Sequence, residues 1–170
     1  ALQKDLLALK KIVFASSYLI YNPDKYLFST PKNSSQVLNE NDPVAPRNLC
    51  GMAKMLHEQE LSFINKFRPD LQVINARIFR SYGKNSRDII SRWIRALLKN
   101  EPITVYCPEG RFDFVYAEDV AHALQLLAAS DFNGIVNIGT GHSRSIGEVL
   151  EILKEHFTSM KCHTEKTIVS

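Results

Sequence analysis

The sequence lacks the features that direct a protein to a membrane or to an oxidising compartment. Its longest apolar runs, such as IVFA and ALQLLAA, are far shorter than the roughly 20 residues that span a bilayer. The chain opens without a basic-then-apolar leader. Its three cysteines are odd in number, far apart and without CxxC spacing, which argues against a disulfide framework and a zinc site. We therefore expect a cytoplasmic protein that does not enter the membrane.

The sequence also has no large excess of positive or negative charge. The chain has 21 basic and 18 acidic residues, a formal net charge of +3, and no basic stripe, so nucleic acid is not an expected partner. His57 and His122 have no partner at metal-ligand spacing, and no metal site is predicted. Hydrophobic residues make up 45% of the 170 residues and charged residues 23%, which is typical of a folded domain with a core.

Helix-type and strand-type patterns alternate along the chain, which predicts the α/β class with a largely parallel sheet. Residues 22–46 hold four prolines and form a long loop, of the kind that is usually functional or mobile. Ser86 is the predicted N-cap of the helix that follows it. The patterns predict helices at 2–11, 47–67, 86–100, 117–130 and 145–157, and strands at 12–16, 71–79, 103–106, 112–116, 134–138 and in the tail from 162.

Polar residues and glycines follow several predicted strands. In parallel sheets, ligands bind beyond the carboxyl ends of the strands. This rule draws attention to Ser16 and Ser17, to Arg80, and to Gly139 and Gly141. In addition, Cys50 and Lys54 are four residues apart on a predicted helix, so their side chains should project from one face.

The order of five motifs resembles one enzyme family. VFASSYLIY, CGMAK, NARIFRSYG, RFDFVYAEDVAHAL and VNIGTG follow one another over residues 1–157 as in the extended short-chain dehydrogenase/reductases, and more narrowly as in the NAD-dependent epimerase/dehydratase group that modifies nucleotide sugars. The resemblance implies a partial Rossmann-like, largely parallel sheet with a small C-terminal substrate-binding lobe. We place the two domains at residues 1–83 and 84–170, the second being truncated.

The resemblance also implies site residues. In the family a Ser or Thr, a Tyr and a Lys four residues later perform acid–base chemistry on a substrate hydroxyl. Ser17 takes the Ser place and Lys54 the Lys place, while Cys50 stands where the family has Tyr. By position, the cofactor-binding residues are Ala15, Ser16, Lys54 and Ile78, and the substrate-binding residues are Arg80, Tyr82 and Arg111.

The cysteine at position 50 leaves three interpretations open. A thiol has a lower reference pKa than a phenol, at ~8.5 against ~10, and a nearby ammonium lowers it further, so Cys50 could act as the acid/base. Its side chain, however, is several ångströms shorter than that of tyrosine. The activity could therefore be lost or altered, or Tyr18 or Tyr21 could reach into the same space.

Two further departures concern the ligands. The family's GxxGxxG turn is absent, and GTGHSRSIG comes after the last family strand, so we expect that about the first hundred residues of a full-length relative are missing and that the end stops within the lobe. NAD or NADP would then bind the full-length parent, and the fragment alone would be inactive. At the substrate end, Arg80 replaces a family Asn and Phe112 a family Arg, while Arg111 lies one position earlier.

Two hypotheses of function follow. The first is an NAD(P)-dependent epimerase/dehydratase-like protein that acts on a nucleotide sugar by transient oxidation of a hydroxyl. The second is a non-catalytic binding or regulatory module that keeps the fold without the catalytic Tyr. In either case the resemblance implies a homodimer formed through helices 2–9 and 47–67, whose outer faces include Leu56 and Phe63.

Overall fold

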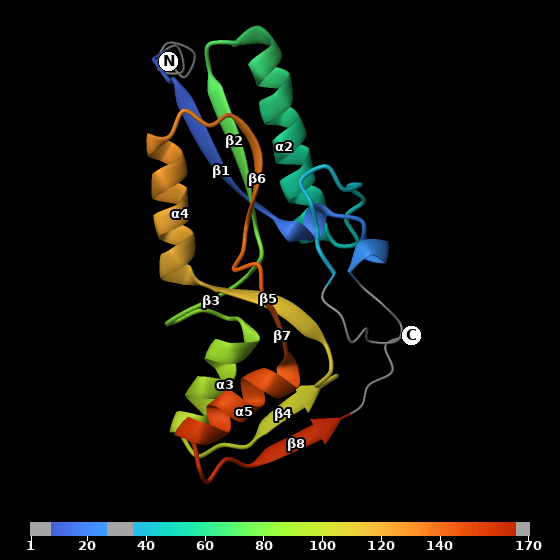
Figure 1. Ribbon diagram of the computed structural model, residues 1–170, viewed down its shortest axis with the longest axis vertical. Helices are drawn as coiled ribbons and strands as arrows, with labels where there is room; N and C mark the ends of the chain where they lie inside the picture. Colours follow the sequence, from blue (N-terminus) through green and yellow to red (C-terminus); the bar gives the residue numbers. More distant parts are fainter. Residues whose placement is uncertain (1–7, 27–35, 166–170) are drawn as a thin grey trace. The chain divides into compact units, whose positions relative to one another are not determined.

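The computed structural model describes residues 8–26 and 36–165 (Figure 1). Its contacts divide the described chain into two compact units. Unit 1 comprises residues 8–26, 36–79 and 119–138, and unit 2 comprises residues 80–118 and 139–165. The predicted domains, residues 1–83 and 84–170, stay a prediction. Within the described ranges, each helix is too short or too polar to cross a bilayer.

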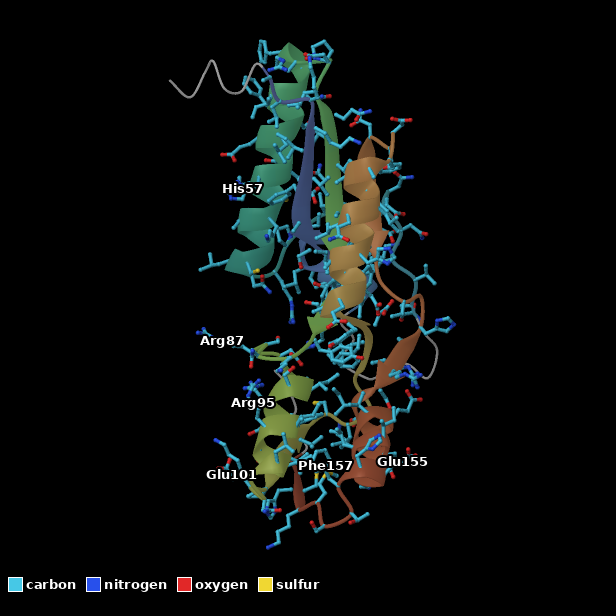
Figure 2. All side chains as sticks on the ribbon, turned by 90° about the vertical axis from the view of Figure 1, so that its left-hand side faces the viewer. His57, Arg87, Arg95, Glu101, Glu155 and Phe157 are labelled. Atoms are coloured by element: carbon cyan, nitrogen blue, oxygen red, sulfur yellow. The ribbon has the colours of Figure 1, made fainter. Side chains whose placement is uncertain are left out.

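Unit 1 contains a three-stranded parallel sheet of β1 (Lys11–Ser17), β2 (Gln72–Ile78) and β6 (Gly134–Ile138), in that order. Helices α2 (Leu49–Phe67) and α4 (Ala117–Ala129) lie on opposite faces of it (Figures 1 and 2). Five consecutive residues of β2, Val73–Arg77, are buried, as expected of a central strand covered on both faces. The predicted α/β class with a parallel sheet is confirmed.

Unit 2 is built around two small sheets and two helices. Strand β3 (Arg80–Tyr82) pairs parallel with β5 (Arg111–Tyr116), which pairs antiparallel with β7 (Ser143–Ser145), while β4 (Ile103–Tyr106) pairs parallel with β8 (Cys162–Glu165). Helices α3 (Ile89–Leu98) and α5 (Ile146–His156) contribute most of the core. The buried cluster consists of Ile90, Trp93, Leu97, Ile103, Val105, Ile146, Val149, Leu150 and Leu153.

Most predicted elements are present, with differences at their ends. The predicted helix at 2–11 lies largely outside the described residues, and residues 8–11 are not helical. The short strands β3 and β7 were not predicted, because three residues are too few to show a periodicity. The exposed arginines of the α3 region include Arg87 and Arg95, which are labelled at the surface in Figure 2.

The predicted N-cap of α3 was wrong by two residues. Asp88 caps the helix: its Oδ1 accepts a hydrogen bond from the backbone N–H of Ser91 at 3.0 Å, and its Oδ2 accepts one from the Ser91 hydroxyl at 2.5 Å. The Ser86 hydroxyl instead accepts from the backbone N–H of Asp88 at 3.2 Å. A carboxylate makes the better cap here because it satisfies two donors and carries the charge that a helix N-terminus favours.

We predict that Asp88→Ala lowers the free energy of unfolding by about 1–2 kcal/mol at pH 7, because the cap is lost. Ser86→Ala, the matched control, should cost less. Partial burial raises the pKa of Asp88, but the hydrogen bonds from Ser91 and Ser86 outweigh it and hold the pKa below its usual value. The contribution of Asp88 is therefore complete above about pH 4 and lost as the pH falls through the folded-state pKa. Urea unfolding at pH 7 and pH 3 checks this; equal losses at both pH values would contradict it.

Candidate functional site

The carboxyl end of β1 is closed by Ser17. Its Oγ accepts a hydrogen bond from the backbone N–H of Leu19 at 3.2 Å, which makes Ser17 the N-cap of the short helix η1 (Tyr18–Ile20). In the parallel register Ser17 lies beside Ile78, the last residue of β2. The two residues therefore sit together at the edge of the sheet where the sequence predicted a ligand site.

Lys54 reaches the same end of β1 from α2. Its Nζ donates a hydrogen bond to the carbonyl of Ala15 at 2.7 Å and lies 5.0 Å from the centre of the Phe14 ring. Ala15 itself is exposed. The Lys54 ammonium is thus bound to the backbone of β1 at Ala15, two residues before Ser17 in the strand.

The first turn of α2 carries Cys50 and packs directly on η1. Asn48 caps this turn, since its Oδ1 accepts from the backbone N–H of Gly51 at 2.8 Å. A Cβ placed on Gly51 would lie only 2.3 Å from the carbonyl oxygen of Leu19, so this close approach requires glycine. The turn with the exposed Cys50 is thereby fixed against the segment that follows Ser17.

Cys50, Lys54 and Glu58 are spaced by one helical turn each, and they form a stripe along α2. Lys54 donates to the backbone carbonyl of Ala15 in β1, and Glu58 accepts from the hydroxyl of Ser16 in β1. The structure therefore brings the predicted catalytic residues Ser17, Cys50 and Lys54 into one corner of unit 1. Their roles stay predictions.

A buried ionic network holds α2 on the sheet. Glu58 accepts two hydrogen bonds from Arg77 of β2, at 3.2 Å from Nε and 2.8 Å from Nη2. It also accepts one from the hydroxyl of Ser16 at 2.5 Å. The three residues are 4–8% exposed. The side chain of Ser16 is thus committed to Glu58, which leaves its backbone for the predicted cofactor contact.

The network continues to Tyr21. Burial lowers the pKa of Arg77, but its hydrogen bonds with Glu58 and Tyr21 outweigh that effect, so the pKa is raised and the charge is secure. The Arg77 guanidinium lies 4.8 Å from the centre of the Tyr21 ring. The Tyr21 hydroxyl donates to Asn137 Oδ1 at 2.7 Å. Burial raises the pKa of the Tyr21 hydroxyl. Tyr21 is fully buried and bonded, which argues against its acting as a substitute acid/base.

Tyr18, the other tyrosine considered, packs among aromatic rings. It stacks on Phe79 with ring centres 5.4 Å apart and meets Tyr26 edge-on at 5.7 Å. It lies directly after Ser17 and is partly exposed. Of the two tyrosines, Tyr18 is the one whose hydroxyl has no bonded partner among the described residues.

The described second part of the proline-rich loop, residues 36–46, is tied to the carboxyl ends of the strands. Arg77 Nη1 donates to the carbonyl of Glu40 at 3.0 Å, and Glu40 Oε1 accepts from the backbone N–H of Asn137 at 2.8 Å. The Asn137 amide donates to the carbonyl of Leu38 at 2.9 Å. This part of the loop is therefore held in place against β2 and β6.

In unit 2, the predicted substrate residue Arg111 is paired within the unit. Its guanidinium donates to Glu148 at 3.3 and 3.2 Å and to the carbonyl of Ser143 at 2.8 Å. The backbone N–H of Ser145 and the Arg111 charge together lower the pKa of Glu148, which closes a capping box at the start of α5. Arg111 thus fastens β5 to β7 and α5.

Arg80 and Tyr82 lie on β3 in aromatic surroundings. The Arg80 guanidinium carbon lies 4.4 Å from the centre of the Phe112 ring. Tyr82 packs against Tyr116, with ring centres 5.5 Å apart, and borders the core cluster of unit 2. Residues 8–26 and 36–165 contain no cluster of His, Cys, Asp and Glu that could hold a metal ion.

Sequence reasoning missed the pairing of Glu58 with Arg77. A signal was present, because an arginine inside an apolar buried strand requires a charged partner. The partner could not be chosen from the sequence, since α2 carries a second acidic residue, Glu60, which forms an ion pair with His57 at the surface.

The comparisons with known proteins agree with this arrangement. The sequence profile of the NAD dependent epimerase/dehydratase family matches residues 2–139. The chain belongs to that family. This match confirms the predicted family, which is NAD-dependent, and the fold predicted with it.

Three relatives illustrate the likeness. A putative UDP-glucose 4-epimerase of Methanocaldococcus jannaschii is 34% identical over 151 residues, covering 85% of this chain and 46% of the relative. A UDP-N-acetylglucosamine 4-epimerase from Methanobrevibacter ruminantium, solved with UDP-N-acetylmuramic acid, is 28% identical with a TM-score of 0.76, covering 92% of this chain and 50% of that one. MoeE5, solved with UDP-glucose and NAD, is 31% identical with a TM-score of 0.75, covering 93% and 51%. The chain spans about half the length of these relatives.

We predict that Glu58→Ala destabilises the protein by about 3–5 kcal/mol, because it leaves the Arg77 charge buried without its partner. Replacing both residues, as Glu58→Leu with Arg77→Met, should cost less than Glu58→Ala alone. Glu60→Ala, an exposed change one half-turn away on α2, is the control and should leave the stability nearly unchanged. Chemical denaturation measures all three; a Glu58→Ala protein as stable as the control would refute the role of the network.

Proposed function

We propose that this chain supplies the acid–base turn and the start of the substrate lobe of an NAD(P)-dependent enzyme that modifies a nucleotide sugar. Family membership and relatives that bind UDP-sugars and NAD support this proposal. The observation that carries it is the hydrogen bond from Lys54 to the Ala15 carbonyl, which holds an ammonium beside Ser17 at the carboxyl end of a parallel sheet.

The residues of this corner fit a bound nicotinamide riboside. Ala15 is exposed at the sheet edge, and the Lys54 ammonium has two further protons that could bind ribose hydroxyls. When bound, NAD or NADP would accept a hydride from the substrate carbon. The chain's own part is to hold the substrate hydroxyl and to remove its proton.

Ser17 is suited to holding the substrate hydroxyl. Its oxygen accepts from Leu19 N–H, so its own proton is free to donate to a substrate oxygen. Lys54 favours the deprotonated form of any acid/base beside it, because its positive charge stabilises the anion. Epimerisation, dehydration and decarboxylation all begin with this transient oxidation in the family, and simple epimerisation or reduction fits the CGMA neighbourhood better than dehydration.

The chemistry of Cys50 distinguishes a catalytic enzyme from a non-catalytic binding module. Its thiol is exposed and one helical turn from Lys54, so it could serve as the acid/base with a short reach. The second candidate function is a binding or regulatory module that keeps the fold. The observation that favours it is the same residue, because a thiol ends well short of where a phenol would end.

We predict that the natural protein at its full length binds NADH and turns over a UDP-sugar, and that Lys54→Met lowers kcat/KM by about 10²-fold or more. Cys50→Tyr should raise the rate if reach is limiting, whereas Cys50→Ser should abolish it if the thiol is the base. NADH fluorescence and product analysis measure these effects. Full-length protein that binds NADH, shows no turnover and gains none in Cys50→Tyr would favour the binding module.

We also propose that the protein is cytoplasmic. We further propose that it forms a homodimer through α2. The outer face of this helix exposes apolar side chains, with Leu56 50% and Phe63 61% exposed, and Phe63 meets the 71% exposed Phe67 edge-on. The companion helix expected at 2–9 lies almost entirely outside the described residues. An exposed apolar stripe of this kind is typical of a helix that packs on a partner.

We predict that Phe63→Glu converts the dimer to a monomer, because it places a charge within the apolar stripe. Leu126→Glu is the matched control: Leu126 is 59% exposed, but it lies on α4, on the other face of the sheet. Sedimentation velocity distinguishes the states. A wild-type monomer, or a Phe63→Glu protein that stays dimeric, would contradict the proposed interface.

A further inference from the structure

One polar side chain of the central strand is buried without a partner. Asn75 lies in β2, two residues before Arg77, and is 8% exposed. Its Oδ1 accepts no hydrogen bond from residues 8–26 or 36–165. Arg77, the next residue on the same face of the strand, is bound by Glu58. A buried amide oxygen costs free energy unless a donor binds it, so Asn75 requires a donor that the described part of the chain does not supply.

A groove opens over Asn75 on the side of the sheet that α2 covers. It is lined by residues of α2, β2 and β6, all of them within unit 1, and has a volume of about 370 Å³. This volume lies within the range of small-molecule sites and is many times the ~30 Å³ that one water molecule occupies in the liquid. The groove therefore has room for a small organic molecule.

The lining of the groove favours a neutral ligand. Its charged members among the described residues are Glu58 and Arg77, which are bound to each other at 2.8 Å. Val44, Met55 and Ile135 provide apolar surface. An ion would lose its hydration in this groove without meeting an unpaired opposite charge of the lining. A neutral molecule with an apolar part fits the groove better.

Two further amides of the lining have their orientation fixed by the backbone. Asn65 Nδ2 donates to the carbonyl of Leu71 at 2.6 Å, which leaves its Oδ1 as an acceptor for a ligand. Asn133 Oδ1 accepts from the backbone N–H of Val73 at 2.9 Å, which leaves its Nδ2 as a donor. Together with Asn75 Oδ1, the groove offers two acceptors and one donor. A primary carboxamide carries the complementary set, two N–H donors and one carbonyl acceptor.

We propose that this groove binds a neutral ligand that carries a primary carboxamide on a small apolar body, and that an N–H of the carboxamide donates to Asn75 Oδ1. Such a ligand would contact α2, β2 and β6 at once. The site is separate from the corner that carries the proposed chemistry, because Ser17, Cys50 and Lys54 are not among its lining residues. The inference therefore goes beyond the proposed function and does not depend on it.

The test titrates benzamide into the natural full-length protein and follows binding by ligand-observed NMR. Excess NAD is present, so that it occupies any nicotinamide site. Benzamide should bind saturably and at least tenfold more tightly than acetophenone, in which a methyl group replaces the amino group and removes both donors. It should also bind at least tenfold more tightly than benzoate, which is charged and has no N–H.

Three variants locate the site. Asn75→Leu, which replaces the amide by an apolar group of the same branching, should weaken benzamide binding at least tenfold. It should leave the Tm of the ligand-free protein unchanged or higher, because an unpaired buried amide is removed. Gln72→Leu is the matched control and should bind benzamide like the wild type, since Gln72 lies on the opposite face of β2. Ser62→Trp, at an exposed position of α2 that lines the groove, should block binding and serves if Asn75→Leu does not fold.

Several outcomes would overturn this inference. They are wild-type protein without saturable benzamide binding, equal affinity for acetophenone, and unchanged benzamide affinity in Asn75→Leu or Ser62→Trp. A crystal structure of the full-length protein grown with benzamide would also overturn it if another part of the chain, or water alone, donated to Asn75 Oδ1. None of these outcomes bears on the NADH binding and turnover that test the proposed function.

Discussion

The contact between Glu58 and Arg77 is the interaction on which the arrangement of unit 1 depends. It joins α2 to the central strand of the sheet, and through Ser16 it also joins the helix to β1. Both charges are buried, so each is tolerated only because the other is present. Because Lys54 precedes Glu58 by one turn, fixing Glu58 on the sheet also fixes the height at which the ammonium meets β1.

The second constraint is the close packing of α2 on η1. Gly51 allows the helix to begin in contact with the Leu19 carbonyl, immediately after Ser17. A helix fastened at its first turn and again at Glu58 has little freedom to shift along the sheet. The chemistry of position 50 is therefore decided by the length and acidity of its side chain, and the backbone around it is fixed.

The sequence was informative about the site of unit 1 and much less so about the network beneath it. Apolar runs with glycine and proline boundaries located β1, β2 and α2 to within a few residues, and motif order placed Ser17 and Lys54. The pairing of Glu58 with Arg77 joins residues of two elements and is decided by tertiary geometry. The N-cap of α3 is decided locally, by the two hydrogen bonds from Ser91 to Asp88, and Ser86 is an equally ordinary cap residue in the sequence. Because tertiary geometry decides their contacts as well, Arg80 and Arg111 looked equivalent in the sequence, although one is paired with Glu148 and the other lies on Phe112.

The most direct test of the central claim is a crystal structure of the natural full-length protein with NAD and UDP-glucose. The account predicts Lys54 Nζ within hydrogen-bonding distance of the nicotinamide ribose hydroxyls, Ser17 Oγ bonded to a sugar hydroxyl, and the nicotinamide ring at the carboxyl ends of β1 and β2. A cofactor bound elsewhere, with Lys54 remote from it, would contradict the account.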